Sequence, residues 1–432
     1  MPRATLLLAA TVLSSVLAAG PVLAQTGGPT SPDKEAEGSA PAKGTRTGQA
    51  SKPVETQPPN APLQKPAFVE QTRAPQPAKM PKTTTAVVAE QLPLMWAIRF
   101  LPDGRLLASA KEGRLYIISQ EGKIGSPIDG VPRVDSKGQG GLLDVVLAPD
   151  FKASNRIFFS FSEPREGGNG TSVATAILSI DEGGNGTLKN VEVIFRQMPT
   201  YDGDKHYGSR LVFGTAGELF VTVGERSDAK VRTQAQDLGS GLGKVFRLNQ
   251  SGKPLADNPF VDKQAAQPEI WSYGHRNVQS AALDADGRLW IVEHGPRGGD
   301  ELNRPQAGFN YGWPDATYGV EYSGKPVGKG TTAKPGTEQP VYYWDPVIGP
   351  SGMALYEGDE IPEWQGAFIV GGLVSTGLVV LHMGDDRVAF EERVPLNARV
   401  RDVRIGPDGA VYALTDDRDT GTSRVLRISR AK

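Results

Sequence analysis

The chain has 432 residues, enough for one large all-β domain or two domains of ordinary size. Its formal net charge is −2 and the sequence has no basic stripe, which argues against nucleic-acid binding. Cysteine is absent, which excludes disulfides, cysteine-ligated zinc and cysteine nucleophiles.

Residues 1–24 have the features of a secretory signal peptide. Arg3 precedes an apolar stretch from Leu6 to Ala19, and Val22-Leu23-Ala24 follows before Gln25, so we expect cleavage after Ala24. This stretch is short for a membrane span, which needs about 20 apolar residues. We therefore predict export by the general secretion route, without stable membrane insertion.

Residues 25–86 are rich in Pro, Thr, Ala, Gln, Lys and Glu and have almost no apolar periodicity. Such a segment buries too little apolar surface to offset the entropy lost on ordering. We predict a disordered, partly extended linker here, followed by one folded domain over residues 87–432.

One phrase recurs in the folded part: a short strand, a tight turn of the Asp-Gly type and a second short strand, which together indicate a hairpin. Its copies are FLPDGRLLASAKEGRLYII at 100–118, FGTAGELFVTVGE at 213–225, LDADGRLWIVEHG at 283–295, IGPDGAVYALTDD at 405–417 and a weaker one at 147–162. This recurrence predicts an all-β fold, a six-bladed β-propeller of four-stranded antiparallel blades. We expect the run at 423–430 to complete the first blade.

One histidine and one acid flank such a hairpin. His206 precedes the first strand and Glu225 ends the second, so antiparallel pairing brings them together. A carboxylate on one imidazole nitrogen raises the basicity of the other, which prepares a general base. A purely structural histidine beside a strand remains the alternative.

Two further places favour an anionic ligand. Gln139 lies in a glycine-lined turn before a buried strand, although a plain tight turn also explains it. Arg399 and Arg401 alternate and so share one face of a strand. Two guanidinium groups in register suit a polycarboxylate, and surface ion pairs are the alternative.

The stretch 270–314 favours a cation site. Arg276 and Asn277 precede one hairpin, and Gly295 and Pro296 follow it, with two acids shortly after. Backbone carbonyls on such a loop, together with carboxylates, are hard-oxygen ligands suited to Ca²⁺. A solvated acidic turn is the alternative. Taken together, the dispersed residues predict a pocket for an anionic, metal-assisted cofactor.

Several phrases, in the same order over about residues 90–428, resemble the soluble aldose sugar dehydrogenases that use pyrroloquinoline quinone (PQQ). The phrases are GQGGLLDVVLAPDF, HYGSRLVF, AQDLGSGLGKVFRLNQSGKPLADNPF, GHRN, EHGPRGGDELNRPQAGFNYGWP and RVRDVRIGPDG. This family within the soluble glucose dehydrogenase superfamily consists of six-bladed propellers exported to the periplasm. The resemblance implies a periplasmic enzyme that oxidises aldoses at C1 to aldonolactones and passes electrons to an unidentified acceptor.

The resemblance also implies a role for each site residue. His206 matches the base that takes the C1 hydroxyl proton as hydride passes to PQQ, and Glu225 matches the acid that orients it. Arg276 matches the arginine beside the quinone C5 oxygen. The remaining implied roles are cofactor contacts for Gln139, Asn277, Arg399 and Arg401, carbonyl ligands to the cofactor's Ca²⁺ for Gly295 and Pro296, a second structural calcium site for Glu301 and Tyr311, and a sugar contact for Trp344.

One departure stands out. Some relatives carry a cofactor-binding lysine where this chain reads FIVGGLVSTGLVVLHM at 368–383, so we expect looser cofactor binding. Ser375 or Thr376 would supply only a neutral hydrogen bond there. The rival functions are a non-catalytic propeller that binds a sugar or a protein partner, and a calcium-dependent lactonase. The sequence leaves monomer and homodimer open.

Overall fold

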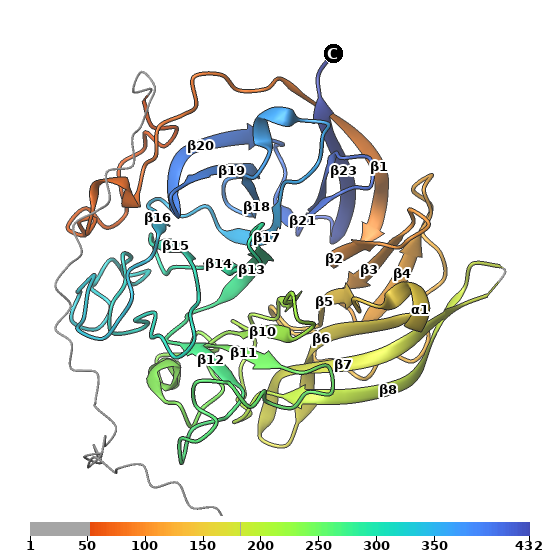
Figure 1. Cartoon of the computed structure of the whole chain (residues 1–432), viewed down its shortest axis with the longest axis horizontal. Coiled ribbons are helices and arrows are strands. Elements are labelled where there is room, and N and C mark those ends of the chain that lie inside the picture. The colour runs from red at the N-terminus through yellow and green to blue at the C-terminus, as the bar shows by residue number, and fades with distance from the viewer. Residues whose placement is uncertain (1–51, 182) are drawn as a thin grey trace, which may run out of the picture. The chain divides into compact units, whose positions relative to one another are not determined.

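The sheets form the predicted propeller. The structure is a computed structural model that describes residues 52–181 and 183–432. Six antiparallel sheets, called blades 1 to 6 here, surround a common axis (Figure 1). Five blades have four strands and blade 1 has three, which confirms the prediction of an all-β six-bladed propeller. The predicted signal peptide at 1–24 lies outside the described residues.

Within each blade the strands run outward from the axis in chain order, and blade 6 also takes in β1. The strands are β2 (Met95–Phe100), β3 (Leu106–Ala110) and β4 (Arg114–Ile118) in blade 1; β5 (Leu142–Leu147), β6 (Arg156–Arg165), β7 (Gly168–Ile180) and β8 (Gly186–Arg196) in blade 2; β9 (Leu211–Phe213), β10 (Leu219–Val223), β11 (Lys244–Leu248) and β12 (Ile270–Tyr273) in blade 3; β13 (Val278–Leu283), β14 (Leu289–Glu293), β15 (Asp300–Asn303) and β16 (Tyr342–Trp344) in blade 4; β17 (Pro350–Leu355), β18 (Phe368–Gly372), β19 (Gly377–Gly384) and β20 (Arg387–Pro395) in blade 5; and β21 (Val400–Ile405), β22 (Val411–Thr415), β23 (Thr422–Arg430) and β1 (Thr83–Pro93) in blade 6.

Helical structure is sparse in the described residues. It consists of α1 (Phe151–Ser154) and the 3-10 turns η1 (Val69–Gln71), η2 (Arg232–Gln236) and η3 (Pro362–Trp364). None of these described helices has the length and apolar character needed to cross a membrane.

The repeated phrase forms the turn between the two innermost strands in four blades. In blade 1, the Leu101 N–H donates to the Arg105 carbonyl at 2.8 Å. Gly104 in this turn has a φ of +84°, a conformation that residues with a Cβ rarely adopt. The equivalent turns span residues 101–105, 214–218, 284–288 and 406–410. The repeated sequence therefore encodes the same turn geometry at four places in the fold.

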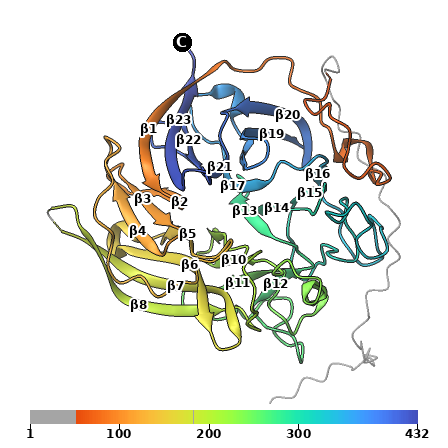
Figure 2. The same ribbon diagram turned by 180° about the vertical axis from the view of Figure 1, so that it is seen from behind.

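Both ends of the folded part close the ring. β1 pairs antiparallel with β23, so that Thr83 lies opposite Arg430 at the outer edge of blade 6. The prediction that 423–430 completes the first blade is wrong, because that run stays in blade 6 and the N-terminal strand is added beside it. The innermost strands contact one another in the order β2, β5, β9, β13, β17 and β21 (Figures 1 and 2).

Apolar side chains hold adjacent blades face to face. Between blades 1 and 2, Leu107 and Ile117 belong to the same buried cluster as Phe159 and Phe161 of β6. Burying each such side chain contributes about 1.5–3 kcal/mol. These interblade layers keep the inner strand ends, and hence the loops they carry, in fixed positions.

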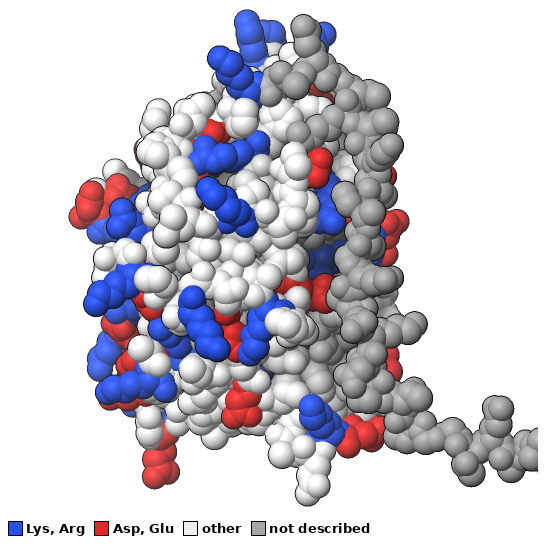
Figure 3. All heavy atoms as spheres, turned by 90° about the vertical axis from the view of Figure 1, so that its left-hand side faces the viewer, with Lys and Arg blue, Asp and Glu red and all other residues white. Residues whose placement is uncertain are grey.

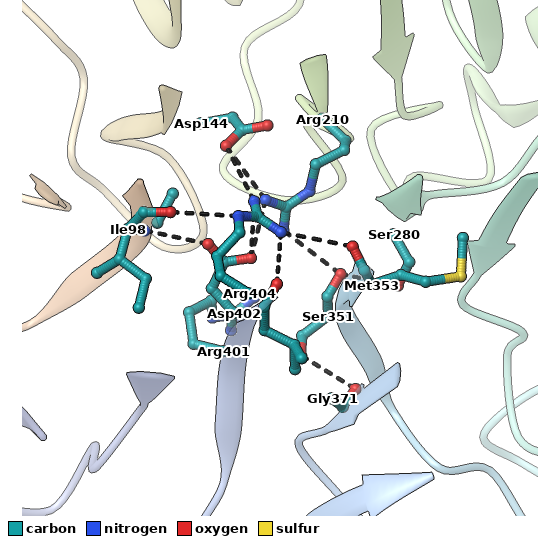
Figure 4. A network of polar contacts seen from close by, with 12 residues as sticks. Ile98, Asp144, Arg210, Ser280, Ser351, Met353, Gly371, Arg401, Asp402 and Arg404 are labelled. Carbon is teal, nitrogen blue, oxygen red and sulfur yellow. Dashed lines mark hydrogen bonds and ion pairs between the residues drawn. The ribbon is translucent and has the colours of Figure 1, made fainter. Parts of the chain in front are cut away.

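The innermost strands also share a buried charged cluster (Figure 4). Arg210 Nη1 donates to Oδ1 of Asp144 and to Oδ1 of Asp402, both at 3.1 Å. Arg99 pairs with Asp144 at 2.8 Å, and Arg404 pairs with Asp402 at 3.0 Å. These five residues come from blades 1, 2, 3 and 6. The members from blades 4 and 5 are Ser280 and Ser351.

Residues 52–82, called the N-terminal segment below, correct the prediction of a disordered linker over 25–86. The segment lies along the outer side of blades 4 and 5 (Figure 1). Ala74 N–H donates to the Tyr342 hydroxyl at 2.8 Å, and Gln71 is fully buried. Hydrogen bonds to residues of the propeller, such as that from Ala74 to Tyr342, hold this segment in place. Regularly spaced apolar residues do not. The earlier part of the predicted linker lies outside the described residues.

Candidate active site

A cavity of about 530 Å³ lies at the N-terminal ends of the innermost strands. Every blade contributes to it, through Met95, Gln139, His206, Asn277, Gly349 and Arg399 among others. Most of the predicted site residues line it: Gln139, His206, Arg276, Asn277, Gly295, Pro296, Arg399 and Arg401. The propeller therefore brings together residues from positions spread over more than half of the chain.

The predicted His–carboxylate pair forms. His206 Nδ1 lies 3.1 Å from Glu225 Oε1, and both side chains are buried. Gln139 Oε1 accepts a hydrogen bond from the His206 backbone N–H at 2.9 Å. His206 has a φ of +50°, an uncommon conformation for a residue with a side chain and one that is often found at functional sites. Because Nδ1 is engaged by Glu225, the second ring nitrogen, Nε2, is the one available to a ligand in the cavity that His206 lines.

The surroundings keep His206 neutral. Burial and the nearby Arg276 lower its pKa, and Glu225 opposes them only in part. Burial alone would raise the pKa of Glu225, but the hydrogen bond with His206 and the charge of Arg276 lower it. The pair is therefore a neutral imidazole held by a carboxylate, the form that a general base requires.

Arg276 lies beside this pair. Its Nη1 donates to the Gly295 carbonyl at 2.7 Å and to the His294 carbonyl at 3.1 Å, and its Nε lies 4.0 Å from Glu225 Oε1. Its backbone N–H donates to Glu293 Oε2 at 2.6 Å. The guanidinium thus links the His–carboxylate pair to the backbone of the Gly-Pro loop.

The adjacent Asn277 has a local positioning role. Its Oδ1 accepts a hydrogen bond from the Gly208 N–H at 3.0 Å. This bond crosses from blade 4 to the loop that carries His206. The bond therefore helps to hold the loop that carries His206 in position beside the cavity.

Two predicted arginines form one wall with an acid that sequence reasoning did not select. Arg401 Nη2 donates to Asp416 Oδ2 at 2.8 Å, and Arg399 Nη2 lies 3.6 Å from the same oxygen. The prediction that the two arginines share a face is confirmed. Arg401 also donates to Gln279 Oε1 at 3.0 Å, which ties blade 6 to blade 4.

The cavity concentrates positive charge. Its cations are Lys111, Arg276, Arg399, Arg401 and Arg418, and its acids are Asp300 and Asp416. Burial raises the pKa of Asp300 to about 7, so this acid is only partly charged near neutral pH. On the outer face in Figure 3, by contrast, Lys and Arg are interspersed with Asp and Glu. The cavity is therefore suited to a ligand with several negative charges.

Several polar atoms of the lining lack a partner. Within the described part of the chain, no hydrogen bond is made by Arg276 Nε, His294 Nε2, Arg399 Nε or Asp416 Oδ1, although all four atoms are buried. Buried polar atoms are normally satisfied, so these four indicate a polar ligand in the cavity.

The lysine-free stretch 368–383 contributes apolar atoms. Leu373 and Val374 line the main cavity, whereas Ser375 lines a neighbouring one. Two other cations line the cavity: Lys111 in the β3–β4 turn and Arg418 after β22. Burial and the nearby Arg418 lower the pKa of Lys111.

Glu301 and Tyr311 lie apart from the main cavity. They line a small cavity of about 10 Å³, near the volume of one water molecule or ion. Burial and the negative charge of Glu293 raise the pKa of Glu301 well above its ordinary value. The Tyr311 hydroxyl donates to the Arg304 carbonyl at 2.7 Å, so it is already engaged. A cation between the carboxylates of Glu293 and Glu301 would relieve the repulsion between them.

The predicted sugar contact by Trp344 is wrong. Its ring is buried between blades 4 and 5, and its Nε1 donates to Glu391 Oε2 at 3.1 Å. Side chains alternate along β16, so Trp344 points to the same side as Tyr342, into the core. Val347, three residues later, lines the cavity instead.

Three charged residues and one histidine of the lining escaped sequence reasoning. Lys111, Asp416 and Arg418 each belong to a copy of the repeated hairpin phrase or to the turn that follows it, where a charged residue is unremarkable. His294 lies in the EHGP phrase beside the predicted calcium carbonyls, and this neighbourhood was the one available signal.

Comparison with known proteins agrees with the geometry. The sequence model of the family described as Glucose / Sorbosone dehydrogenase matches residues 91–427. The chain belongs to this family. Among curated members, it is similar to the aldose sugar dehydrogenase YliI of Escherichia coli (strain K12), with 43% identity over 350 residues that cover 79% of this chain and 92% of that protein.

Solved structures of related dehydrogenases have the same fold. The apo form of the soluble aldose sugar dehydrogenase from Escherichia coli superposes with a TM-score of 0.75 at 40% identity, over 81% of this chain and 100% of that one. The PQQ-bound form of the aldose sugar dehydrogenase from Streptomyces coelicolor superposes with a TM-score of 0.66 at 28% identity, over 82% of this chain and 99% of that one.

Proposed function

We propose that this glucose/sorbosone dehydrogenase family member is a quinoprotein aldose dehydrogenase, which uses PQQ and Ca²⁺ to oxidise aldose sugars at C1 to aldonolactones. The observation that carries the proposal is the pairing of His206 with Glu225 on the wall of a cationic cavity. A neutral, oriented imidazole beside a site for an anion is the arrangement that such a reaction needs.

The cavity fits PQQ, which carries several carboxylates. Arg399, Arg401 and Lys111 are suited to hold those carboxylates, and the unpartnered polar atoms of the lining would gain partners. The PQQ-bound structure of the aldose sugar dehydrogenase from Streptomyces coelicolor supports this assignment. When bound, PQQ supplies the redox chemistry by accepting hydride from the sugar.

The chain's own residues move the proton. His206 Nε2 takes the proton of the C1 hydroxyl, and the Glu225 carboxylate stabilises the imidazolium that results. This base contributes about 10²- to 10⁴-fold in rate. The Arg276 guanidinium stabilises negative charge that develops beside it, because it is fixed in advance by the Gly295 and His294 carbonyls.

Calcium has two proposed places. Gly295 and Pro296 would offer carbonyls to the ion bound with the cofactor, and the Glu293–Glu301 pair would hold a structural ion. Among the described residues, no three His, Asp or Glu side chains cluster as metal ligands. The proposal therefore rests on backbone oxygens and on one pair of carboxylates.

We also propose that the protein is exported to the periplasm after removal of residues 1–24, and that an electron acceptor there reoxidises the cofactor. The signal-like composition of the N-terminus supports this location. The proposed partners are thus an aldose and an electron acceptor, and the protein acts as a monomer or homodimer.

Dye-linked oxidation of glucose by the purified apo-protein tests the proposal. We expect activity only when PQQ and Ca²⁺ are both added, and we expect His206→Ala to bind PQQ but to remain inactive. Binding of sugar without PQQ binding would contradict the proposal and favour a non-catalytic sugar-binding propeller. Calcium-dependent lactone hydrolysis without PQQ would favour a lactonase.

A further inference from the structure

A second cavity lies next to the active-site cavity. Its volume is about 320 Å³, within the range of small-molecule sites. Both cavities are lined by Val347 and Val374, from the loops that precede β17 and follow β18. Val374 is exposed, so these two valines form an apolar ridge that separates the cavities.

The outer wall of the second cavity comes from the N-terminal segment. Glu55 and Gln57 line it, opposite Ser375 and Arg393 of blade 5. The family match begins only at residue 91. This wall is therefore a feature of the present chain that lies outside the region shared with the family.

The wall is anchored to the propeller. Arg73 Nη1 donates to the Glu55 carbonyl at 3.0 Å, and its Nη2 donates to the carbonyls of Gln57 at 2.7 Å and Asp345 at 2.8 Å. The Asp345 carboxylate in turn accepts the Asn60 N–H at 2.7 Å. Asp345 lies two residues before Val347, so the same loop holds the wall and forms the ridge.

The second cavity offers both hydrogen-bond donors and hydrogen-bond acceptors. Ser375 Oγ and Arg393 Nη2 are buried and have no hydrogen-bond partner among the described residues. Glu55 presents a carboxylate and Gln57 an amide from the other side. Arg393 is already paired with Glu391 through its Nε, so the Glu55 carboxylate adds an acceptor with one negative charge. Hydroxyl groups, which both donate and accept, match this set.

We propose that the second cavity is a subsite for the non-reducing ring of a disaccharide aldose, with Glu55 and Gln57 as specificity-determining residues. The proposal rests on the proposed function, because the reducing ring must lie with its C1 at His206. The non-reducing ring then crosses the Val347–Val374 ridge, whose apolar surface suits the faces of sugar rings, and its hydroxyls meet the free polar atoms beyond.

Steady-state kinetics with glucose and maltose test this subsite. In the double variant Glu55→Ala/Gln57→Ala, we expect kcat/KM for maltose to fall about tenfold, the effect of one or two lost hydrogen bonds. The change should appear in KM, because these contacts lie far from the reacting atoms. Kinetics with glucose should be unchanged. The matched control, Glu70→Ala/Gln64→Ala, alters an acid and an amide of the same segment that line neither cavity.

The outcomes separate this proposal from the proposed function. Equal losses of kcat/KM for both sugars, or no loss of kcat/KM for maltose, would overturn the subsite. Oxidation of glucose by the same proteins would still support the proposed dehydrogenase activity. If neither sugar is oxidised, calorimetric titration with methyl maltoside decides the subsite by itself. Weaker binding to the double variant than to the control would support it, and equal binding would refute it. If the double variant fails to fold, Ser375→Ala on the opposite wall replaces it, and this variant should weaken maltose binding in the same way.

Discussion

Nδ1 of His206 lies 3.1 Å from Oε1 of Glu225, although the two residues are nineteen positions apart. The contact depends on the register of β9 and β10, in which Leu211 lies opposite Val221. His206 and Glu225 follow at the open end of this hairpin. The same pairing that builds blade 3 therefore also assembles the proposed base.

Glu225→Gln should lower kcat on the order of 10²-fold, because the imidazolium loses its carboxylate. Burial and Arg276 lower the pKa of His206, so the acid limb of the wild-type kcat/KM profile should lie below the ordinary value of 6.5. Glu225 raises that pKa, and its removal should shift the limb to still lower pH. A pH–rate profile of both proteins measures this. Glu225→Asp keeps the charge and should restore part of the rate; an unshifted limb would contradict the assignment.

Lys111→Met should weaken PQQ binding by about tenfold, because a charge-assisted contact is lost. Lys111 lines the cavity together with the arginines of blade 6. The dissociation constant is measured by absorbance titration of the apo-protein. Lys137→Met is the control, since Lys137 is exposed on a neighbouring loop and does not line the main cavity. Equal affinity of both variants would mean that Lys111 does not contact the cofactor.

Calcium should raise the melting temperature of the apo-protein more at pH 8 than at pH 5. The pKa of Glu301 is raised by burial and by the charge of Glu293, so its ionised form destabilises the fold as pH rises. A bound cation offsets this cost through mass action. Thermal melts with calcium or with a chelator at both pH values test this. Glu301→Gln should melt higher than wild type without calcium and gain less when calcium is added.

Asp402→Asn should destabilise the protein by about 3–5 kcal/mol at pH 7, because Arg210 and Arg404 lose a buried partner. Burial alone would raise the pKa of Asp402, but the surrounding arginines lower it. Its stabilisation is therefore present above the ordinary value of 3.8 and lost as pH falls below it. Denaturant unfolding at pH 7 and pH 3 should show a smaller pH effect in the variant. Asp257→Asn, in an exposed pair with Arg247, should change little.

Sequence patterns, together with the family resemblance, predict the blades and eight residues of the cavity lining. The repeated turn marks the inner hairpin of four blades. His206, Arg276 and Arg401 stand out because the residues around them are richer in polar and charged groups than a turn requires. Lys111 and Arg418 did not stand out, because each looks like an ordinary charged turn residue until the ring brings both to one cavity.

Two errors have a common physical origin. The family resemblance implies a sugar contact for Trp344, but the alternation along β16 turns its ring into the core. The N-terminal segment lacks an apolar period, a pattern that is typical of a linker. It is held by contacts such as that of Ala74 with Tyr342, which lies far away in the sequence. In both cases the deciding partner belongs to another part of the chain.

The pairing of β1 with β23 joins residues 83–93 to residues 422–430 in one sheet. This contact spans almost the whole folded part, so its formation costs more loop-closure entropy than the hairpin pairings inside the other blades. The innermost strands do not depend on it, because β21 contacts both β2 and β17. Opening of the ring at blade 6 would therefore expose the edges of β1 and β23 and leave the inner circle in contact.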